Sequence, residues 1–219
     1  MTNREYNFKK LCVLVADDNH HMRKLLSDLL EVIGVGRIAL AQDGADAFDR
    51  YLEVAPDIVI TDGAMAPMDG YELTRKIRME PDSPNPFVPV LMLSGHLEKA
   101  RVEMARDSGV TEYLAKPVST DSLRIRIVSV IENPRPFVRT AAYFGPDRRR
   151  RVKDLQTGPS RRADDAGLSV QTPTGKGGDD LLAQCLGNPV KGAETPQGVE
   201  FVDNPTRLLA KVAPLTKTP

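Results

Sequence analysis

The sequence predicts an α/β domain built on a doubly wound, five-stranded parallel sheet. Between residues 11 and 131, five short apolar runs alternate with five longer amphipathic segments. Short runs rich in Val, Ile and Leu are typical of strands that are covered on both faces. Helices that connect such strands by right-handed crossovers cover both faces of one open sheet.

The expected elements follow one another with short connections. Strands are expected at residues 11–16, 38–41, 58–61, 88–93 and 112–115. Helices are expected at residues 20–33, 44–54, 71–79, 97–107 and 120–131. Apolar residues recur at helical spacing in the first helix, and Gly34 follows it as a C-cap residue. The segment 80–89 contains four prolines and is therefore expected to be a loop.

Charge and composition limit the class of protein. The chain of 219 residues has 30 basic and 30 acidic side chains, but residues 1–132 hold 21 of the acidic ones. Net neutrality therefore excludes neither an anionic nor a cationic partner. No apolar stretch approaches the roughly 18–20 residues of a membrane helix. The start of the chain is polar, which does not suit a secretory signal, and two cysteines make no disulfide framework. We expect a cytoplasmic protein without a transmembrane segment.

The composition changes after residue 132, which predicts three parts. They are a folded domain at 8–132, an aromatic and arginine-rich junction at 133–153, and a low-complexity tail at 154–219. Frequent Pro and Gly with scarcely any aromatic residues predict that the tail is disordered. Two apolar islands, 181–186 and 201–212, interrupt it, and the sequence leaves open whether they fold on binding.

The junction places aromatic residues directly before a run of arginines. That run consists of Arg148, Arg149, Arg150 and Arg151. It is open to three interpretations, namely a solvated basic run, a contact to nucleic acid or anionic lipid, and a docking peptide for an acidic protein. We expect residues 137–144 to pack on the domain and to leave the arginines exposed.

Polar residues that carry chemistry stand at the ends of the expected strands. Asp17 and Asp18 follow the first strand, Asp62 the third, Ser94 the fourth, and Lys116 with Pro117 the fifth. In open α/β sheets, ligands bind outside the carboxyl ends of the strands. Carboxylates that meet in one pocket repel one another unless a cation is present, and a few carboxylates with water suit Mg²⁺. An added lysine and hydroxyl favour a phosphoryl group, with one carboxylate as its nucleophile.

As a set, these residues make the segment 11–131 resemble the CheY-like receiver domain of bacterial two-component response regulators. The resemblance includes Asp62 in DIVITDGAMAPMDG, Ser94 in VLMLSG, and Tyr113 in EYLAKP. It implies a flavodoxin-like sheet with strand order 2-1-3-4-5. It also implies a phosphoprotein that takes part in a phosphorelay rather than a metabolic enzyme.

The resemblance implies a role for each site residue. Asp62 is the implied phosphoacceptor, and Lys116 is the implied phosphate contact, with a cis bond to Pro117. Mg²⁺ is implied as the cofactor, held by Asp17, Asp18, Asp62 and the backbone carbonyl of Ala64. Ser94 is implied to move toward the phosphate, and Tyr113 is the implied aromatic switch that turns inward with it.

The sequence departs from the family pattern in the loop after Asp62. The family usually has proline four residues after the phosphoacceptor, where this chain has Ala66 followed by Pro67. The two variable positions that tune dephosphorylation are Ala64 and His96. Because Ala64 cannot orient a water molecule, we expect the phosphorylated state to last longer than in relatives with a polar residue there.

The expected partners are a sensor histidine kinase or a histidine phosphotransfer protein, and a downstream protein. The downstream target would bind the face formed by residues 97–107 and 120–131. No periodic block long enough for a DNA reader follows the domain, so we do not expect a transcription factor. Two alternatives stay open: a tail that binds nucleic acid or membrane as the output, and a receiver-like domain that is never phosphorylated. The second is disfavoured because each acidic ligand and the lysine are present.

Overall fold

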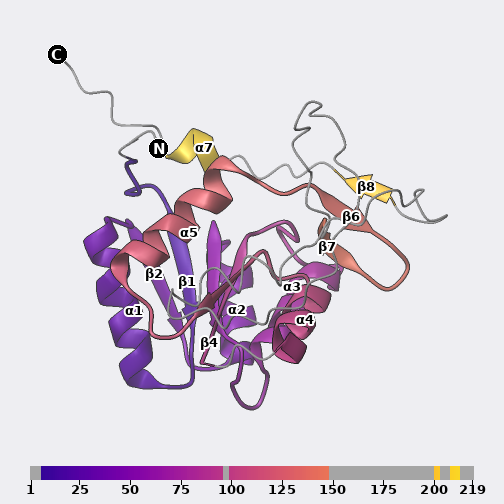
Figure 1. The fold of residues 1–219 in the computed structure, drawn as a ribbon, viewed down its shortest axis with the longest axis horizontal. Helices are drawn as coiled ribbons and strands as arrows, with labels where there is room; N and C mark the ends of the chain where they lie inside the picture. The colour runs from indigo at the N-terminus through magenta and orange to yellow at the C-terminus, as the bar shows by residue number, and fades with distance from the viewer. Residues whose placement is uncertain (1–5, 96–98, 148–199, 203–207, 213–219) are drawn as a thin grey trace, which may run out of the picture.

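The main sheet has five parallel strands in the predicted order β2-β1-β3-β4-β5 (Figure 1). The computed structural model describes residues 6–95, 99–147, 200–202 and 208–212. The strands are β1 (Cys12–Ala16), β2 (Arg37–Ala41), β3 (Ile58–Asp62), β4 (Val90–Ser94) and β5 (Glu112–Ala115). The helices are α1 (His20–Ile33), α2 (Gly44–Val54), α3 (Gly70–Met79), α4 (Lys99–Ser108) and α5 (Thr120–Glu132). The predicted fold class is confirmed, with element ends that differ by at most two residues.

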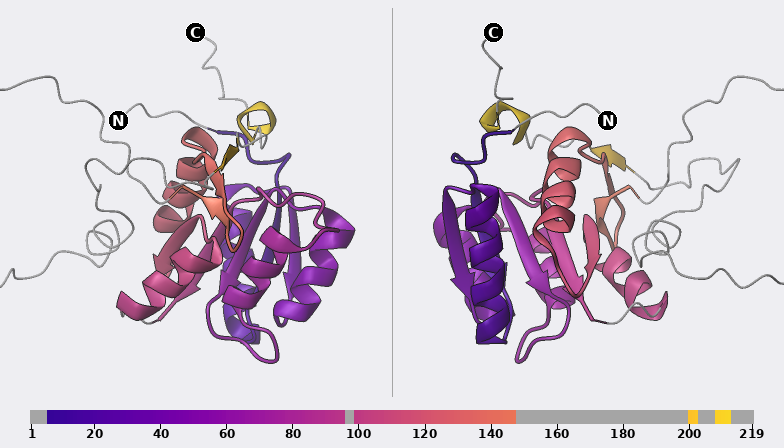
Figure 2. Two further views of the ribbon diagram at one scale, coloured as in Figure 1. Left: turned by 90° about the vertical axis from the view of Figure 1, so that its right-hand side faces the viewer. Right: turned by 60° about the vertical axis from the view of Figure 1, so that its left-hand side comes forward.

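Helices cover both faces of the sheet (Figure 2). Val13 and Val15 of β1 pack in one apolar cluster with residues of α1 and α5, whereas Leu14 packs in a second cluster with residues of α2 and α3. Since both faces are covered, every residue of β1 is buried. This explains why the strand has no alternation of polar and apolar residues.

Polar caps fix where the helices begin, at the edge of the sheet where the strands end. The Asn19 side chain accepts hydrogen bonds from the backbone N–H groups of His21 and Met22 at the start of α1. Asp69 and Glu72 form a capping box at the start of α3. Each cap satisfies N–H groups that have no partner within the helix. The caps thereby fix the loops that follow β1 and β3.

The junction folds back onto the domain as a hairpin of β6 (Phe137–Arg139) and β7 (Phe144–Pro146). Phe137 and Phe144 are buried, and their rings lie 5.0 and 5.1 Å from the ring of Phe87, measured between centroids. Residues 137–144 therefore pack on the domain, as the sequence suggested. The arginine run that follows lies outside the described residues.

A buried arginine joins this hairpin to the domain. The guanidinium of Arg78, near the end of α3, donates hydrogen bonds to the carbonyl oxygens of Pro86, Val88 and Gly109. It also lies 5.2 Å from the ring centroid of Phe137. Its burial lowers the pKa of Arg78 to about 10. Three backbone acceptors and one aromatic ring hold this charge in place.

Two parts of the tail differ from the prediction of disorder. Residues 200–202 form β8 (Glu200–Val202), which pairs with β6, and residues 208–211 form α7 (Leu208–Lys211). Leu208 and Val212 are buried in the apolar cluster that also contains residues of α1 and α5. Lys211 forms an ion pair of 2.6 Å with Asp57. The prediction of disorder came from the composition averaged over the whole tail. The apolar island at 201–212 departs from that average and can bury apolar side chains on the domain. The rest of the tail, including the island at 181–186, lies outside the described residues.

The domain also extends beyond its predicted first residue. Tyr6 packs in the main apolar cluster, and its hydroxyl donates a hydrogen bond to Glu132 at the end of α5. None of the helices within the described part of the chain is long and apolar enough to cross a membrane.

Candidate functional site

The predicted site residues meet at the carboxyl ends of the strands, the lower edge of the sheet in Figure 1. Asp17 and Asp18 directly follow β1, Asp62 is the last residue of β3, and Lys116 directly follows β5. Ser94 is the last residue of β4. The parallel register aligns these ends, since Ala16 of β1 pairs with Thr61 of β3. Residues far apart in the sequence therefore share one pocket.

Three carboxylates form the centre of this site. One carboxylate oxygen from each of Asp17, Asp18 and Asp62 lies within 4.8 Å of the others. Asp17 is fully buried, Asp18 is exposed, and the side chain of Asp62 is 14% exposed. Hard divalent cations prefer oxygen ligands, and Mg²⁺ keeps water on its open positions. The donor set and its partial exposure therefore fit Mg²⁺.

Lys116 places a cation against two of these carboxylates. Its Nζ lies 3.0 Å from Oδ2 of Asp17 and 3.2 Å from Oδ1 of Asp62. Burial alone would lower the pKa of Lys116, but the hydrogen bonds and charges of both aspartates raise it above its usual value. Lys116 is therefore charged at neutral pH. The Lys116–Pro117 peptide bond is cis, as the resemblance implied.

The environment of Asp62 favours its protonated form more than water does. Burial raises the pKa of Asp62, Lys116 opposes this shift, and the charge of Asp17 adds to it. The backbone N–H of Gly63 donates a hydrogen bond of 2.8 Å to Oδ1 of Asp62. A neighbouring cation therefore stabilises the ionised form of Asp62.

Close backbone packing fixes the position of Asp62. A Cβ atom on Gly70, the first residue of α3, would lie 2.0 Å from the carbonyl oxygen of Asp62. Only glycine permits this approach. The loop between them contains a second cis bond, Ala66–Pro67, at the place where the sequence departs from the family pattern. The part of the Ala64 carbonyl in metal binding stays a prediction.

Asp17 is fixed by its own loop. Its Oδ1 accepts a hydrogen bond of 2.9 Å from the backbone N–H of Asn19. Its carbonyl oxygen accepts one of 2.6 Å from the guanidinium of Arg23 on α1. The capped start of α1 therefore also orients the buried carboxylate.

Ser94 and Tyr113 lie together behind the site. Both are buried, so the ring of Tyr113 lies inward in this structure. Burial raises the pKa of Tyr113, and the neighbouring hydroxyls of Ser94 and Tyr71 oppose this shift. The movement of Ser94 and Tyr113 that the resemblance implies stays a prediction.

Some predicted residues lie outside the described part of the chain. These are His96, Arg148, Arg149, Arg150, Arg151 and the first residues of the predicted partner face at 97–107. The described remainder of that face comprises α4 and α5, which lie on opposite faces of the sheet on either side of β5.

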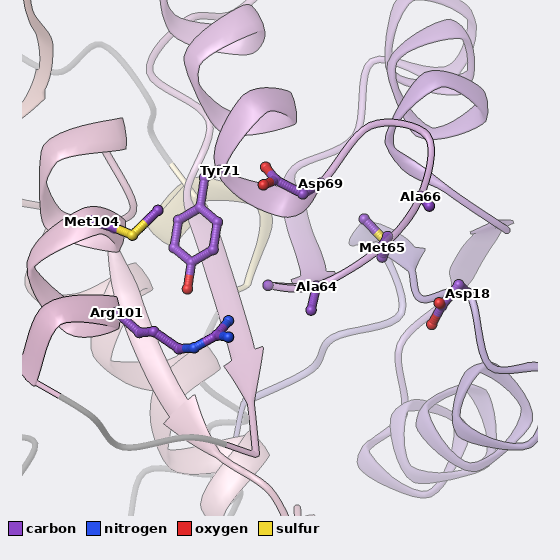
Figure 3. Close-up of a pocket in the computed structure, with 9 residues that line it drawn as sticks. Asp18, Ala64, Met65, Ala66, Asp69, Tyr71, Arg101 and Met104 are labelled. Atoms are coloured by element: carbon purple, nitrogen blue, oxygen red, sulfur yellow. The ribbon is translucent and has the colours of Figure 1, made fainter.

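The sequence did not point to two residues beside the site, Tyr71 and Arg101. They line an open pocket of about 560 Å³ together with Asp18, Gly63, Ala64, Met65, Ala66, Asp69 and Met104 (Figure 3). The only sequence signal for Tyr71 is its place two residues after Asp69, in the first turn of a helix that begins at the site. Arg101 has no such signal, because its position depends on how α4 packs against α3.

Comparison with known proteins agrees with the resemblance. A family model described as the response regulator receiver domain matches residues 13–128. The protein-glutamate methylesterase/protein-glutamine glutaminase of Haloarcula marismortui is 41% identical over 118 residues, which cover 52% of this chain and 31% of that protein. The protein of the same name from Halobacterium salinarum is 38% identical over 112 residues, which cover 51% of this chain and 31% of that protein. The chain thus spans about a third of the length of these relatives.

Two solved structures match along almost their whole length, and their fold is that of the main sheet and its helices. The chemotaxis protein CheY4 of Vibrio cholerae is 28% identical with a TM-score of 0.51, over 55% of this chain and 98% of CheY4. A response regulator receiver domain protein from Clostridium thermocellum is 29% identical with a TM-score of 0.50, over 56% of this chain and 94% of that chain. Since the family model covers more than half of the sequence, this chain belongs to the response regulator receiver domain family.

Proposed function

We propose that this chain is a phosphorylation-dependent response regulator in which Asp62 accepts a phosphoryl group. The meeting of Lys116 with Asp17, Asp18 and Asp62 at one edge of the sheet is the observation that supports this most. The donor would be a phosphohistidine of a sensor histidine kinase or of a histidine phosphotransfer protein. The cytoplasmic location expected from the sequence is part of this proposal.

The transfer moves one phosphoryl group between two side chains. A carboxylate oxygen of Asp62 forms a bond to phosphorus while the P–N bond to the donor histidine breaks, and the imidazole nitrogen keeps the electron pair. Lys116 keeps its proton and neutralises charge on a phosphoryl oxygen. Mg²⁺, bound by Asp17, Asp18, Asp62 and the Ala64 carbonyl, would neutralise charge on the transferring oxygens. Water then hydrolyses the acyl phosphate and releases inorganic phosphate.

The signal would pass from Asp62 to the surface through the residues behind it. The Ser94 hydroxyl would move to donate a hydrogen bond to the phosphoryl group, and Tyr113 would occupy the space that it leaves. This change would alter the surface of α4 and α5, to which the downstream protein would bind. The face formed by 97–107 and 120–131 is therefore the proposed output surface.

We propose a signalling switch rather than an esterase. The methylesterase name belongs to the two archaeal relatives, of which this chain covers only 31%. The chain would assist only its own phosphorylation and dephosphorylation. The arginine run lies outside the described residues, so an output through nucleic acid or membrane stays the alternative.

Phosphorylation by acetyl phosphate tests this proposal directly. With Mg²⁺ present, we expect the full chain to carry one acid-labile phosphoryl group, visible as a mass increase on an intact-protein mass spectrum. Asp62→Asn should carry none, whereas Asp49→Asn on the exposed side of α2 should be labelled like the wild type. Labelling of Asp62→Asn, or of none of the three, would contradict the proposal.

A further inference from the structure

The pocket beside Asp62 contains a buried hydroxyl, that of Tyr71, for which none of the described residues is a hydrogen-bond partner in good geometry. Tyr71 is only 2% exposed, and its Oη makes no hydrogen bond to any of the residues that the structure describes. The hydroxyl of Tyr113 and the guanidinium of Arg101 lie near it: burial raises the pKa of Tyr71, Tyr113 adds to this shift, and Arg101 opposes it. Buried polar groups are almost always paired, because an unpaired one loses its bond to water without replacement. The Tyr71 hydroxyl thus has an unused donor at the pocket wall.

An unpaired cation stands beside this hydroxyl. Figure 3 shows the guanidinium of Arg101 extending from α4 toward the middle of the pocket, next to the Tyr71 hydroxyl. Within the described ranges, no carboxylate lies at ion-pair distance from Arg101. A guanidinium presents several donors in one plane and suits phosphoryl oxygens especially well. The two side chains together offer an anion both charge and hydrogen-bond donors.

Their position relates this pair to the phosphoacceptor. Tyr71 Oη lies 3.3 Å from the point where a Cβ of Gly63 would stand, and Gly63 directly follows Asp62. Lys116 contacts Asp62 but does not line this pocket. Ala64 contributes only a methyl group to the pocket wall, so no polar side chain at that position contacts the phosphoryl group. A second set of donors on this side of Asp62 therefore complements Lys116.

We infer that Arg101 and the Tyr71 hydroxyl bind the phosphoryl group carried by Asp62. The inference rests on the proposed function, since it needs Asp62 to be the phosphoacceptor. Arg101 donates N–H groups to a phosphoryl oxygen, and Tyr71 donates its O–H, for which the described residues offer no acceptor in good geometry. Both residues stabilise the phosphorylated state without taking part in bond formation.

Binding of a phosphoryl analogue tests the inference. Beryllofluoride with Mg²⁺ is titrated into the full chain by calorimetry, for wild type, Tyr71→Phe, Arg101→Gln and the exposed control Arg75→Gln. We expect Arg101→Gln to bind about tenfold more weakly, equivalent to about 1.4 kcal/mol, as for one charge-assisted hydrogen bond. Tyr71→Phe should bind several-fold more weakly, and Arg75→Gln like the wild type.

Thermal unfolding without the analogue separates binding from a structural role. Tyr71→Phe removes only an unpaired buried hydroxyl, so its melting temperature should equal or exceed that of the wild type. Wild-type affinity for beryllofluoride in either Tyr71→Phe or Arg101→Gln would overturn the inference. A lower melting temperature of Tyr71→Phe would also overturn it, because weaker binding would then follow from a destabilised fold. If the wild type neither binds beryllofluoride nor is labelled at Asp62, the proposed function itself fails.

Discussion

The acidic pocket should cost the fold free energy when no cation neutralises it, and Asp62→Asn measures that cost. Carboxylate oxygens of Asp17, Asp18 and Asp62 lie within 4.8 Å of one another. Two unit charges at this separation repel by about 1 kcal/mol in water and about 3.5 kcal/mol at an effective dielectric constant of 20. The Nζ of Lys116 lies 3.2 Å from Oδ1 of Asp62, and the attraction between these two charges offsets one of the two repulsions on Asp62.

The substitution therefore removes two repulsions and one attraction, together with the cost of burying a charge. For Asp62→Asn we expect an increase of about 1 kcal/mol in the free energy of unfolding at pH 7 without divalent cations. For a chain of this size, that corresponds to a rise of about 2–4 °C in Tm. Mg²⁺ should then stabilise the wild type more than the variant, because only the wild type retains all three carboxylates.

The pH dependence gives this prediction a second test. The folded pKa of Asp62 is raised by burial against the opposing effect of Lys116, so ionisation of Asp62 destabilises the fold. This destabilisation is fully present above the folded pKa. It disappears as the pH falls through that value toward the usual 3.8. The stability difference between wild type and Asp62→Asn should therefore shrink in acid.

Urea denaturation followed by circular dichroism checks both expectations. Wild type, Asp62→Asn and the surface control Asp49→Asn are compared in a chelating buffer at neutral and acidic pH, and again with Mg²⁺. The control should match the wild type within about 0.5 kcal/mol throughout. An Asp62→Asn variant that is less stable than the wild type at pH 7 without cations would refute the reasoning. A stabilisation that does not change with pH would refute the assigned cause.

Three further substitutions test the packing around the site and the junction. Arg78→Met leaves three carbonyl acceptors without their donor, so chemical denaturation should show a loss of about 3 kcal/mol or more, with Arg75→Met near wild type. Gly70→Ala forces a Cβ against the carbonyl of Asp62 and should lose about 1–3 kcal/mol by the same measurement, whereas Gly95→Ala, which meets nothing within 4 Å, should not. Leu208→Ala should lose about 2–3 kcal/mol in thermal unfolding if α7 packs as described, and an effect no larger than that of the exposed Ala210→Ser would contradict this packing.

The fold and the central site could be predicted because each depends on a pattern local to the chain. Each strand is a short apolar run, and parallel pairing places every carboxyl end at one edge. Asp17, Asp62 and Lys116 needed no further information to be placed together. Their distances then follow from the register of β1, β3, β4 and β5.

What the sequence could not predict depends on contacts between elements. Arg78 lies in an amphipathic helix, where an arginine is normally expected on the exposed face, yet the hairpin and two loops bury it. The strands of that hairpin have three residues each, too few for a recognisable period. Tyr71 and Arg101 approach each other only because α3 packs beside α4. None of these features has a signature in a single segment.

The two groups of unpredicted residues are connected through one helix. Tyr71 stands in the first turn of α3, at the edge of the sheet where the carboxyl ends of the strands lie, and Arg78 stands in its last turn at the opposite edge. A helix of ten residues is about 15 Å long. If the phosphoryl group proposed on Asp62 binds Tyr71 and displaces the whole of α3, the guanidinium next to Phe137 moves with the helix. A receiver that ended after α5 would have no hairpin to respond to that movement. Helix α3 thus connects the hairpin of β6 and β7 with the candidate site, although the two lie at opposite ends of the strands.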